Sequence, residues 1–188
     1  TLTINTTHGI IISQDCDLSI LGNLVNAGSL TTNAGSTGIT SLFIYGNLTN
    51  SGTLNFNSSL SQLYFEGSTA QTFTNSGTIT SNIIQTLNID NNSGVTFSAF
   101  SQQVSIYNIY LFDGVLFRSA NLKIGDGLSG FIQIGGNNGA FVAGSFDAAP
   151  TFNTGSQLTL LYGTCDLSST GFEIPSNSTV NNFYLAST

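Results

Sequence analysis

Charged residues are scarce in this chain of 188 residues, where two bases, nine acids and one histidine give a net charge of −7. Charged residues make up 6% of the sequence, against roughly 25% in an average soluble domain. Neutral polar side chains must therefore solvate the surface. With only two bases, almost no counterion release is available to favour a phosphate backbone, so we expect no nucleic-acid partner.

Long apolar runs are also missing. No run approaches the roughly 18 to 20 residues that cross a bilayer, so we expect no membrane insertion. Methionine and tryptophan are absent, yet hydrophobic residues make up 40% of the chain, which excludes an intrinsically disordered protein. The length suits one apolar core, and we expect a single folding unit over residues 1–188.

A repeat of 24 residues is present. Residues 18–33 read LSILGNLVNAGSLTTN and residues 42–57 read LFIYGNLTNSGTLNFN. A third copy begins with LYFEG at Leu63 and resumes with TNSGTITSN at residues 74–82. An apolar-x-apolar pair marks each copy, and the pairs along the chain are Leu18/Ile20, Leu42/Ile44, Leu63/Phe65, Leu87/Ile89, Ile109/Leu111, Ile132/Ile134, Leu158/Leu160 and Phe183/Leu185.

The pattern inside each repeat is typical of strands. Apolar residues alternate at spacing two and the turns fall on Gly, Asn and Ser, with no helical period. Short units of this length bury their apolar residues when coils stack and each strand pairs in parallel with its equivalent one coil away. We therefore predict an all-β fold, a parallel β-helix (β-solenoid) of about 7–8 coils with a repeat of about 24 residues.

Asn-x-Gly turns recur in the repeats. We expect glycine to take a positive φ there and asparagine to hydrogen-bond along its own stack. The four turns are Asn26/Gly28, Asn50/Gly52, Asn75/Gly77 and Asn92/Gly94.

The period breaks most at residues 135–150, GGNNGAFVAGSFDAAP, which we interpret as an irregular insertion, with a domain boundary as the alternative. Strand-like sequence runs to both ends without a capping segment. Because an uncapped solenoid presents unpaired strand edges, we expect a fragment of a longer repetitive chain, or a unit that polymerises end to end. The expected partners are neighbouring repeats of the same chain or other copies in a filament.

Residues 87–97 (LNIDNNSGVTF), 109–127 (IYLFDGVLFRSANLKIGDG) and 169–185 (STGFEIPSNSTVNNFYL) have a recognisable texture. They resemble the repetitive β-helical regions of very large secreted cell-surface proteins of Bacteroidetes. That family comprises adhesins and gliding-type filament proteins, typically exported by the type IX secretion system through a separate C-terminal sorting domain. The resemblance implies an extracellular, cell-surface location, and it supplies no catalytic residues. No sorting domain is visible in this sequence.

Candidate catalytic residues are few. Parallel β-helices do carry polysaccharide lyases and hydrolases, which need clamping bases or a matched carboxylate pair. Here His8 lies in a TTHG turn, and Arg118 and Lys123 fit a solvated surface pair better than a substrate clamp. We expect no enzyme and assign no catalytic residue.

Four aspartates could offer oxygen ligands to calcium: Asp15, Asp17, Asp90 and Asp126. The regular Gly/Asp nonapeptide of calcium-binding β-rolls is absent, which favours ordinary turn aspartates over a bound calcium ion. No other cofactor is expected.

Cys16 and Cys165 lie about six coils apart in this register. At about 4.8 Å per coil they are far beyond the 7 Å limit for bridged Cα atoms, so they should not pair with each other. We expect buried free thiols, with bridges to cysteines elsewhere in a longer chain as the alternative.

Outward aromatic residues are the strongest binding signal. The alternation places Phe43, Tyr64 and Tyr110 in one outward column, and Tyr45 and Phe112 in another. Aromatic side chains on adjacent coils can stack on sugar rings or bind a protein. A covering loop, or a register slip of one residue, would bury them instead. The candidate ligand-binding residues are Phe43, Tyr45, Tyr64 and Tyr110.

The leading functional hypothesis is a non-enzymatic structural and adhesive module of a long, secreted cell-surface fibre, in which stacked coils act as a stiff stalk. The alternative is a carbohydrate-binding face that uses the outward aromatic residues on surface glycans. Ice binding is a third reading, but strict Thr-x-Thr repeats on one flat face are missing.

Overall fold

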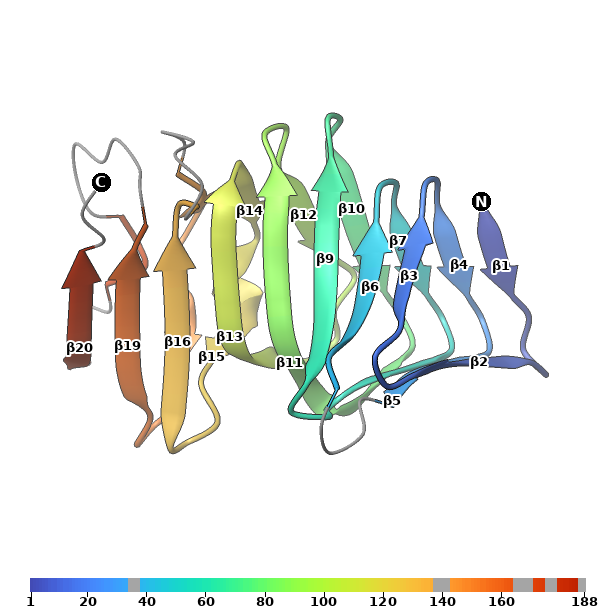
Figure 1. Cartoon of the computed structure of the whole chain (residues 1–188), viewed down its shortest axis with the longest axis horizontal. Helices are drawn as coiled ribbons and strands as arrows, with labels where there is room; N and C mark the ends of the chain where they lie inside the picture. The colour runs from blue at the N-terminus through green and yellow to red at the C-terminus, as the bar shows by residue number, and fades with distance from the viewer. Residues whose placement is uncertain (34–37, 137–142, 164–170, 175–178, 186–188) are drawn as a thin grey trace.

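The computed structural model describes residues 1–33, 38–136, 143–163, 171–174 and 179–185. Within these ranges the chain winds into about seven coils of roughly 24 residues, and every strand pairing is parallel. The prediction of a parallel β-solenoid is confirmed. Figure 1 shows the coils following one another along the long axis, with the first described strand at one end and the last at the other.

Each coil contributes strands to three faces. Face A is one seven-stranded sheet. Its strands are β1 (Leu2–Ile4), β4 (Leu24–Asn26), β7 (Leu48–Asn50), β10 (Gln71–Asn75), β12 (Val95–Ser98), β14 (Val115–Phe117) and β17 (Ser145–Phe146). Each of these strands begins a new coil, so coil 1 starts at β1 and coil 7 at β17.

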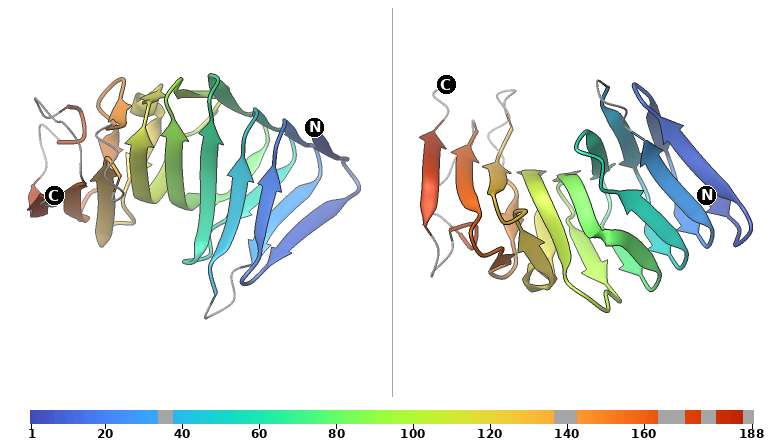
Figure 2. Two further views of the ribbon diagram at one scale, coloured as in Figure 1. Left: turned by 45° about the horizontal axis from the view of Figure 1, so that its top comes forward. Right: turned by 90° about the horizontal axis from the view of Figure 1, so that it is seen from below.

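Faces B and C belong to one continuous 13-stranded sheet that bends around the core. Face B holds β2 (Gly9–Ser13), β5 (Ser29–Asn33), β8 (Thr53–Phe56), β15 (Leu122–Ile124) and β18 (Thr151–Phe152). Face C holds β3 (Asp17–Ile20), β6 (Thr40–Ile44), β9 (Ser61–Gly67), β16 (Ser129–Ile134), β19 (Gln157–Tyr162) and β20 (Val180–Leu185). The long strands β11 (Thr78–Asn91) and β13 (Val104–Asp113) cross from face B to face C without a break. In Figure 1 face C is nearest the viewer, and the two views of Figure 2 show the bend between the faces.

The core consists of apolar columns that run from coil to coil. On face C the column of Leu42, Leu63, Leu87, Ile109 and Ile132 is fully buried, and each member pairs in register with the next. Burying a side chain of this size contributes roughly 1.5–3 kcal/mol. These residues alternate with outward ones, so the period-two pattern fixes which residues face solvent.

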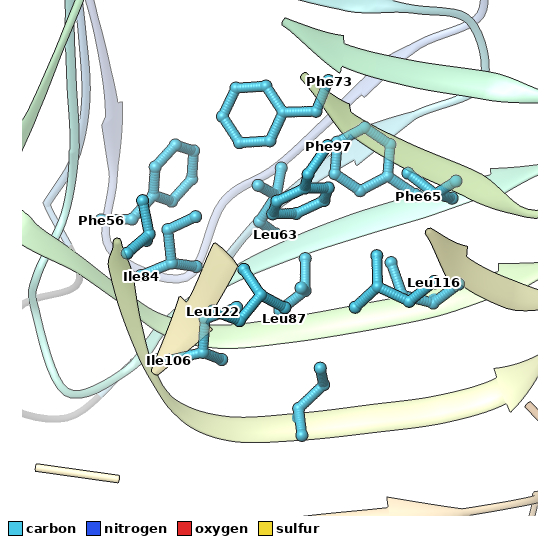
Figure 3. Close-up of a cluster of buried hydrophobic side chains, with 14 of the residues drawn as sticks. Phe56, Leu63, Phe65, Phe73, Ile84, Leu87, Phe97, Ile106, Leu116 and Leu122 are labelled. Atoms are coloured by element: carbon cyan, nitrogen blue, oxygen red, sulfur yellow. The ribbon is translucent and has the colours of Figure 1, made fainter. Parts of the chain in front are cut away.

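Three phenylalanines fill the middle of the solenoid. The ring centroids of Phe65, Phe73 and Phe97 lie 5.1–6.2 Å apart, and all three side chains are fully buried. Figure 3 shows these rings among the aliphatic side chains of neighbouring coils. Aromatic pairs at such distances add to the stability that area burial provides.

The predicted marker pair of coil 7 was wrong. The register aligns Leu160 with Ile132 and Tyr162 with Ile134, so the pair is Leu160/Tyr162 and not Leu158/Leu160. A tyrosine fits this inward position because its hydroxyl donates a hydrogen bond to the buried Glu173. Because a tyrosine replaces the second aliphatic residue of the pair, the search for an apolar-x-apolar pair missed the correct register.

A ladder of buried asparagines runs along face A. The side-chain nitrogen of Asn26 donates to Asn50, and that of Asn50 donates to Asn75. The predicted stacking is therefore found in three of the four Asn-x-Gly turns. In the fourth, Asn91 rather than Asn92 points inward, and its Nδ2 lies 2.7 Å from Oε1 of Gln71.

Glycine serves these turns by its lack of a side chain. Among the four predicted glycines only Gly94 has the expected positive φ, at 81°. A Cβ atom at Gly52 would lie 2.1 Å from the carbonyl oxygen of Gly28, and one at Gly77 would lie 2.2 Å from that of Gly52. The turns of successive coils thus approach too closely for any side chain.

Part of the predicted irregular insertion, residues 137–142, lies outside the described residues. After it, Ser145 and Phe146 of β17 pair with Val115 and Leu116, so face A continues into coil 7. In the described part of the chain, no helix is long and apolar enough to cross a bilayer.

Candidate functional site

The predicted aromatic column lies on the outer surface of face C. Phe43 pairs in register with Tyr64, and Asn88 lies between Tyr64 and Tyr110 on the next coils. Each of these residues sits between two inward residues of its strand, so its side chain projects outward. Phe43, Tyr64 and Tyr110 are all half-buried.

Phe43 and Tyr64 stack on each other. Their ring centroids are 4.4 Å apart and their planes meet at 21°. One face of each ring is therefore covered by the other ring. The two rings do not lie side by side with both faces available to a ligand, as the outward column suggested. The other face of Phe43 is turned toward coil 1, where its register partner is the small, exposed Ser19.

Asn88 interrupts the aromatic column. Its side chain is 3% exposed, and its Nδ2 atom has no hydrogen-bond partner in the described part of the chain. The register places it between Tyr64 and Tyr110, where an amide N–H can point toward an aromatic ring. Burial raises the pKa of Tyr110, as it does that of Tyr64.

The second predicted column, of Tyr45 and Phe112, is not continuous. β13 shifts register after Leu111, so Asp113 rather than Phe112 pairs with Asp90. The ring of Phe112 instead lies 5.7 Å from that of Tyr110. The bulge moved the aromatic residue out of the column, and nothing in the strand pattern revealed it.

Acidic side chains accompany Tyr45 at this edge of face C. Its hydroxyl donates to Oε2 of Glu66 at 2.6 Å, and this bond raises the pKa of Tyr45. Glu66, Asp90 and Asp113 pair in register on three successive coils. Partial burial raises the pKa of Asp90, and the charges of Glu66 and Asp113 raise it further.

A hollow of about 640 Å³ opens beside the stacked rings on coils 1 to 3. Phe43 and Tyr64 border one side of it. The other side is bordered by a second column on the same three coils, whose members lie two residues earlier in each strand: Asp17, Ser41 and Gln62. Asp15 and Ile39 complete the lining. The hydroxyl of Tyr64 donates to Oε1 of Gln62, which fixes the ring at the rim.

The other predicted candidates are dispersed. Asp126 closes a turn by accepting hydrogen bonds from the backbone N–H groups of Leu128 and Ser129, and the bond from Ser129 is the main cause of its lowered pKa. His8 is exposed in a turn of coil 1, whereas Lys123 lies on face B in coil 6. No group of three or more His, Cys, Asp or Glu side chains among the described residues could hold a metal ion.

Cys16 is a free cysteine and is exposed, so the expectation of a buried thiol was wrong for this residue. It directly precedes β3, after the turn at residues 14–15, so its side chain is not held in the inward alternation of a strand. Cys165 lies outside the described residues.

The outward surface of face A does not form a regular threonine array. One column runs Thr3, Val25, Thr49, Thr74 and Ser98 across five coils. Asn47 accepts a hydrogen bond from the backbone N–H of Thr72 in the neighbouring column. The ice-binding reading gains no support from this mixed surface.

Sequence reasoning found the rings but missed the hollow beside them. Asp15 comes from a turn, and Ser41 and Gln62 come from two different strands. Only the coil-to-coil register, with Asp17 opposite Ser41 and Ser41 opposite Gln62, brings them together. In the sequence, Asp17, Ser41 and Gln62 each directly precede a marker pair. This constant position is the one signal that could have revealed the column.

Comparisons with protein-family models, with curated proteins and with solved structures found no match for this chain.

Proposed function

We propose that this chain is a non-enzymatic structural segment of a secreted cell-surface fibre, in which the solenoid acts as a stiff spacer. The observation that carries the proposal is the internal stacking, in which apolar columns continue from coil to coil and a buried asparagine ladder joins coils 2 to 4. Seven coils at about 4.8 Å each make a body roughly 34 Å long.

The physical basis of stiffness is that each coil is bonded to the next on three faces. Bending the body would break parallel backbone hydrogen bonds on one face and separate the apolar columns beneath it. Because charged residues are only 6% of the chain, these contacts depend little on ionic strength. A segment of this kind would hold a binding region away from a cell in a variable salt environment.

Labelling of intact cells tests the proposal. Antibodies against this chain, applied to cells that produce the native protein, should label them without permeabilisation, and gold-labelled antibodies should mark thin fibres in electron micrographs. Labelling that requires permeabilisation, or a soluble protein with no associated fibre, would contradict the proposed role.

A second candidate function, binding of a glycan on face C, is supported by one specific observation. The uncovered face of Phe43 is turned toward the small side chain of Ser19 and borders an open hollow. A flat aromatic face beside polar groups suits the apolar face of a sugar ring.

A glycan array probed with monomeric chain tests this second candidate. Phe43→Ala should abolish any binding and Tyr64→Ala should weaken it, since Tyr64 supports the ring of Phe43 from behind. Phe117→Ala, which removes a partly exposed aromatic residue from face A, serves as the control. Unchanged binding by Phe43→Ala would overturn the assignment.

A further inference from the structure

The hollow on coils 1 to 3 contains polar groups whose hydrogen-bonding capacity is unused. Ser41 lines it and is only 5% exposed, yet its hydroxyl makes no hydrogen bond with any described residue. Among the described residues, the buried side-chain atoms without a partner are Oδ1 of Asn26 and Nδ2 of Asn88, so the Ser41 hydroxyl oxygen itself is reachable from the hollow. A ligand in the hollow would supply the missing partner.

Two carboxylates at the same hollow are also free. The carboxylates of Asp15 and Asp17 make no hydrogen bond within the described residues, in contrast to those of Asp126 and Asp147, whose oxygens accept bonds from backbone N–H groups. The carboxylate of Asp15 lies against Gly38, where a Cβ atom would be 1.9 Å from Oδ1. The absence of a side chain at Gly38 leaves the room that this carboxylate occupies.

Neither the lysine nor the arginine of this chain lies near these charges. The two bases of the chain, Arg118 and Lys123, both belong to coil 6, whereas Asp15 and Asp17 belong to coil 1. Five coils at about 4.8 Å place roughly 24 Å between them along the axis, well beyond the Debye length of about 8 Å at physiological salt. The hollow therefore attracts cations and repels anionic groups.

We propose that this hollow binds a sugar unit that carries a free amino group, as in a polysaccharide with glucosamine units. This inference rests on the glycan-binding candidate described above and adds the class of sugar. The apolar face of the ring packs on Phe43, the ammonium group pairs with Asp15 and Asp17, and a sugar hydroxyl bonds to Ser41. Sulfated and uronic-acid glycans are disfavoured by the same two carboxylates.

The test uses two oligosaccharides of equal length, one of β-linked glucosamine and one of β-linked N-acetylglucosamine, at a mildly acidic pH where the amine is protonated. Calorimetric titration of the whole chain should show about tenfold tighter binding of the amino form, and the preference should shrink as salt is raised. The double variant Asp15→Asn/Asp17→Asn should bind both forms with the affinity that the native chain has for the acetylated one.

Asp90→Asn is the matched control, because it removes the same charge from an exposed residue of face C outside the hollow. It should leave the preference unchanged, which separates the hollow from the general attraction between an acidic protein and a cationic sugar. Equal binding of both forms, or a preference that survives in the double variant, would overturn the inference and leave the glycan-binding candidate standing. Absence of binding to either form would overturn the inference, and the glycan array would then decide the glycan-binding candidate by itself.

Discussion

The Nδ2 atom of Asn26 lies 2.7 Å from Oδ1 of Asn50, and both side chains are completely buried although 24 residues separate them in the sequence. The same atom of Asn26 also donates to the carbonyl oxygen of Thr53 at 2.9 Å. One amide therefore joins two coils through a side chain and a backbone group. The bond stabilises the stacking register directly, since a shift of one residue would turn Asn50 to the other side of its strand and leave the buried amide of Asn26 without this partner.

Asn50→Ala should be strongly destabilising. It removes the bonds to Asn26 and Asn75 and leaves their buried polar atoms without these partners, so we expect a loss of about 3 kcal/mol in the free energy of unfolding. Thr49→Ala, at the neighbouring exposed position of β7, should change it by less than about 0.5 kcal/mol. Urea denaturation of both variants measures the difference, and equal losses would show that the ladder adds no stability.

Gly52→Ala should destabilise the protein for steric reasons. The new methyl group would lie 2.1 Å from the carbonyl oxygen of Gly28, so the two coils must separate at a cost of about 1–3 kcal/mol. Gly9→Ala is the control, because its nearest contact would be an ordinary 3.4 Å. Thermal unfolding should distinguish the two, and a midpoint for Gly52→Ala equal to that of the control would refute the close-approach argument.

Asp147 should stabilise the fold at neutral pH and lose this effect in acid. Burial alone would raise its pKa, but hydrogen bonds from the Ser119 hydroxyl and from the backbone N–H groups of Arg118 and Ser119 outweigh burial and lower it. Because the pKa is lower in the folded state, the ionised carboxylate stabilises the fold at any pH above its unfolded-state pKa of 3.8. This stabilisation disappears as pH falls through the folded-state pKa.

Asp147→Asn should therefore be less stable than the native chain at pH 7, by about 1 kcal/mol because the residue is partly solvated. The difference should disappear at a pH below the folded pKa. Urea denaturation across this pH range provides the measurement. A difference that persists unchanged into acid would mean that the carboxylate charge is not what the hydrogen bonds stabilise.

Asp90 should show the opposite dependence. Its pKa is raised by partial burial and by the charges of Glu66 and Asp113, so its ionisation destabilises the fold. The stabilisation from the protonated form is complete below the unfolded-state pKa of 3.8, and it is lost as pH rises through the folded-state pKa. Asp90→Asn should increase the free energy of unfolding at pH 7 by roughly 0.3 kcal/mol. The gain should vanish in acid, and a variant less stable than the native chain at neutral pH would contradict this account.

Much of the fold could be predicted because each coil repeats the same alternation. Leu42, Leu63 and Leu87 share one buried column, as their spacing in the sequence indicated. The prediction failed where a local feature changed the register, at the bulge beside Phe112 and at the inward Tyr162. Neither a bulge nor a hydrogen-bonded buried tyrosine alters the apolar pattern in a way that a period can detect.

The candidate site was only partly accessible to the same reasoning. Phe43 and Tyr64 could be placed on one outward column, but the tilt of their rings depends on the space between coils. The free carboxylate of Asp15 reaches the hollow through the path of a turn in which its φ is 57°. Turn paths of this kind are not encoded in the strand alternation.

Urea unfolding at low and high salt tests the central claim that one continuous, largely uncharged stack of coils holds this protein together. Tyrosine fluorescence and circular dichroism should report a single coincident transition, and its midpoint should be nearly the same at about 50 mM and about 500 mM sodium chloride. Separate transitions for the two probes, or a midpoint that moves strongly with salt, would contradict the claim.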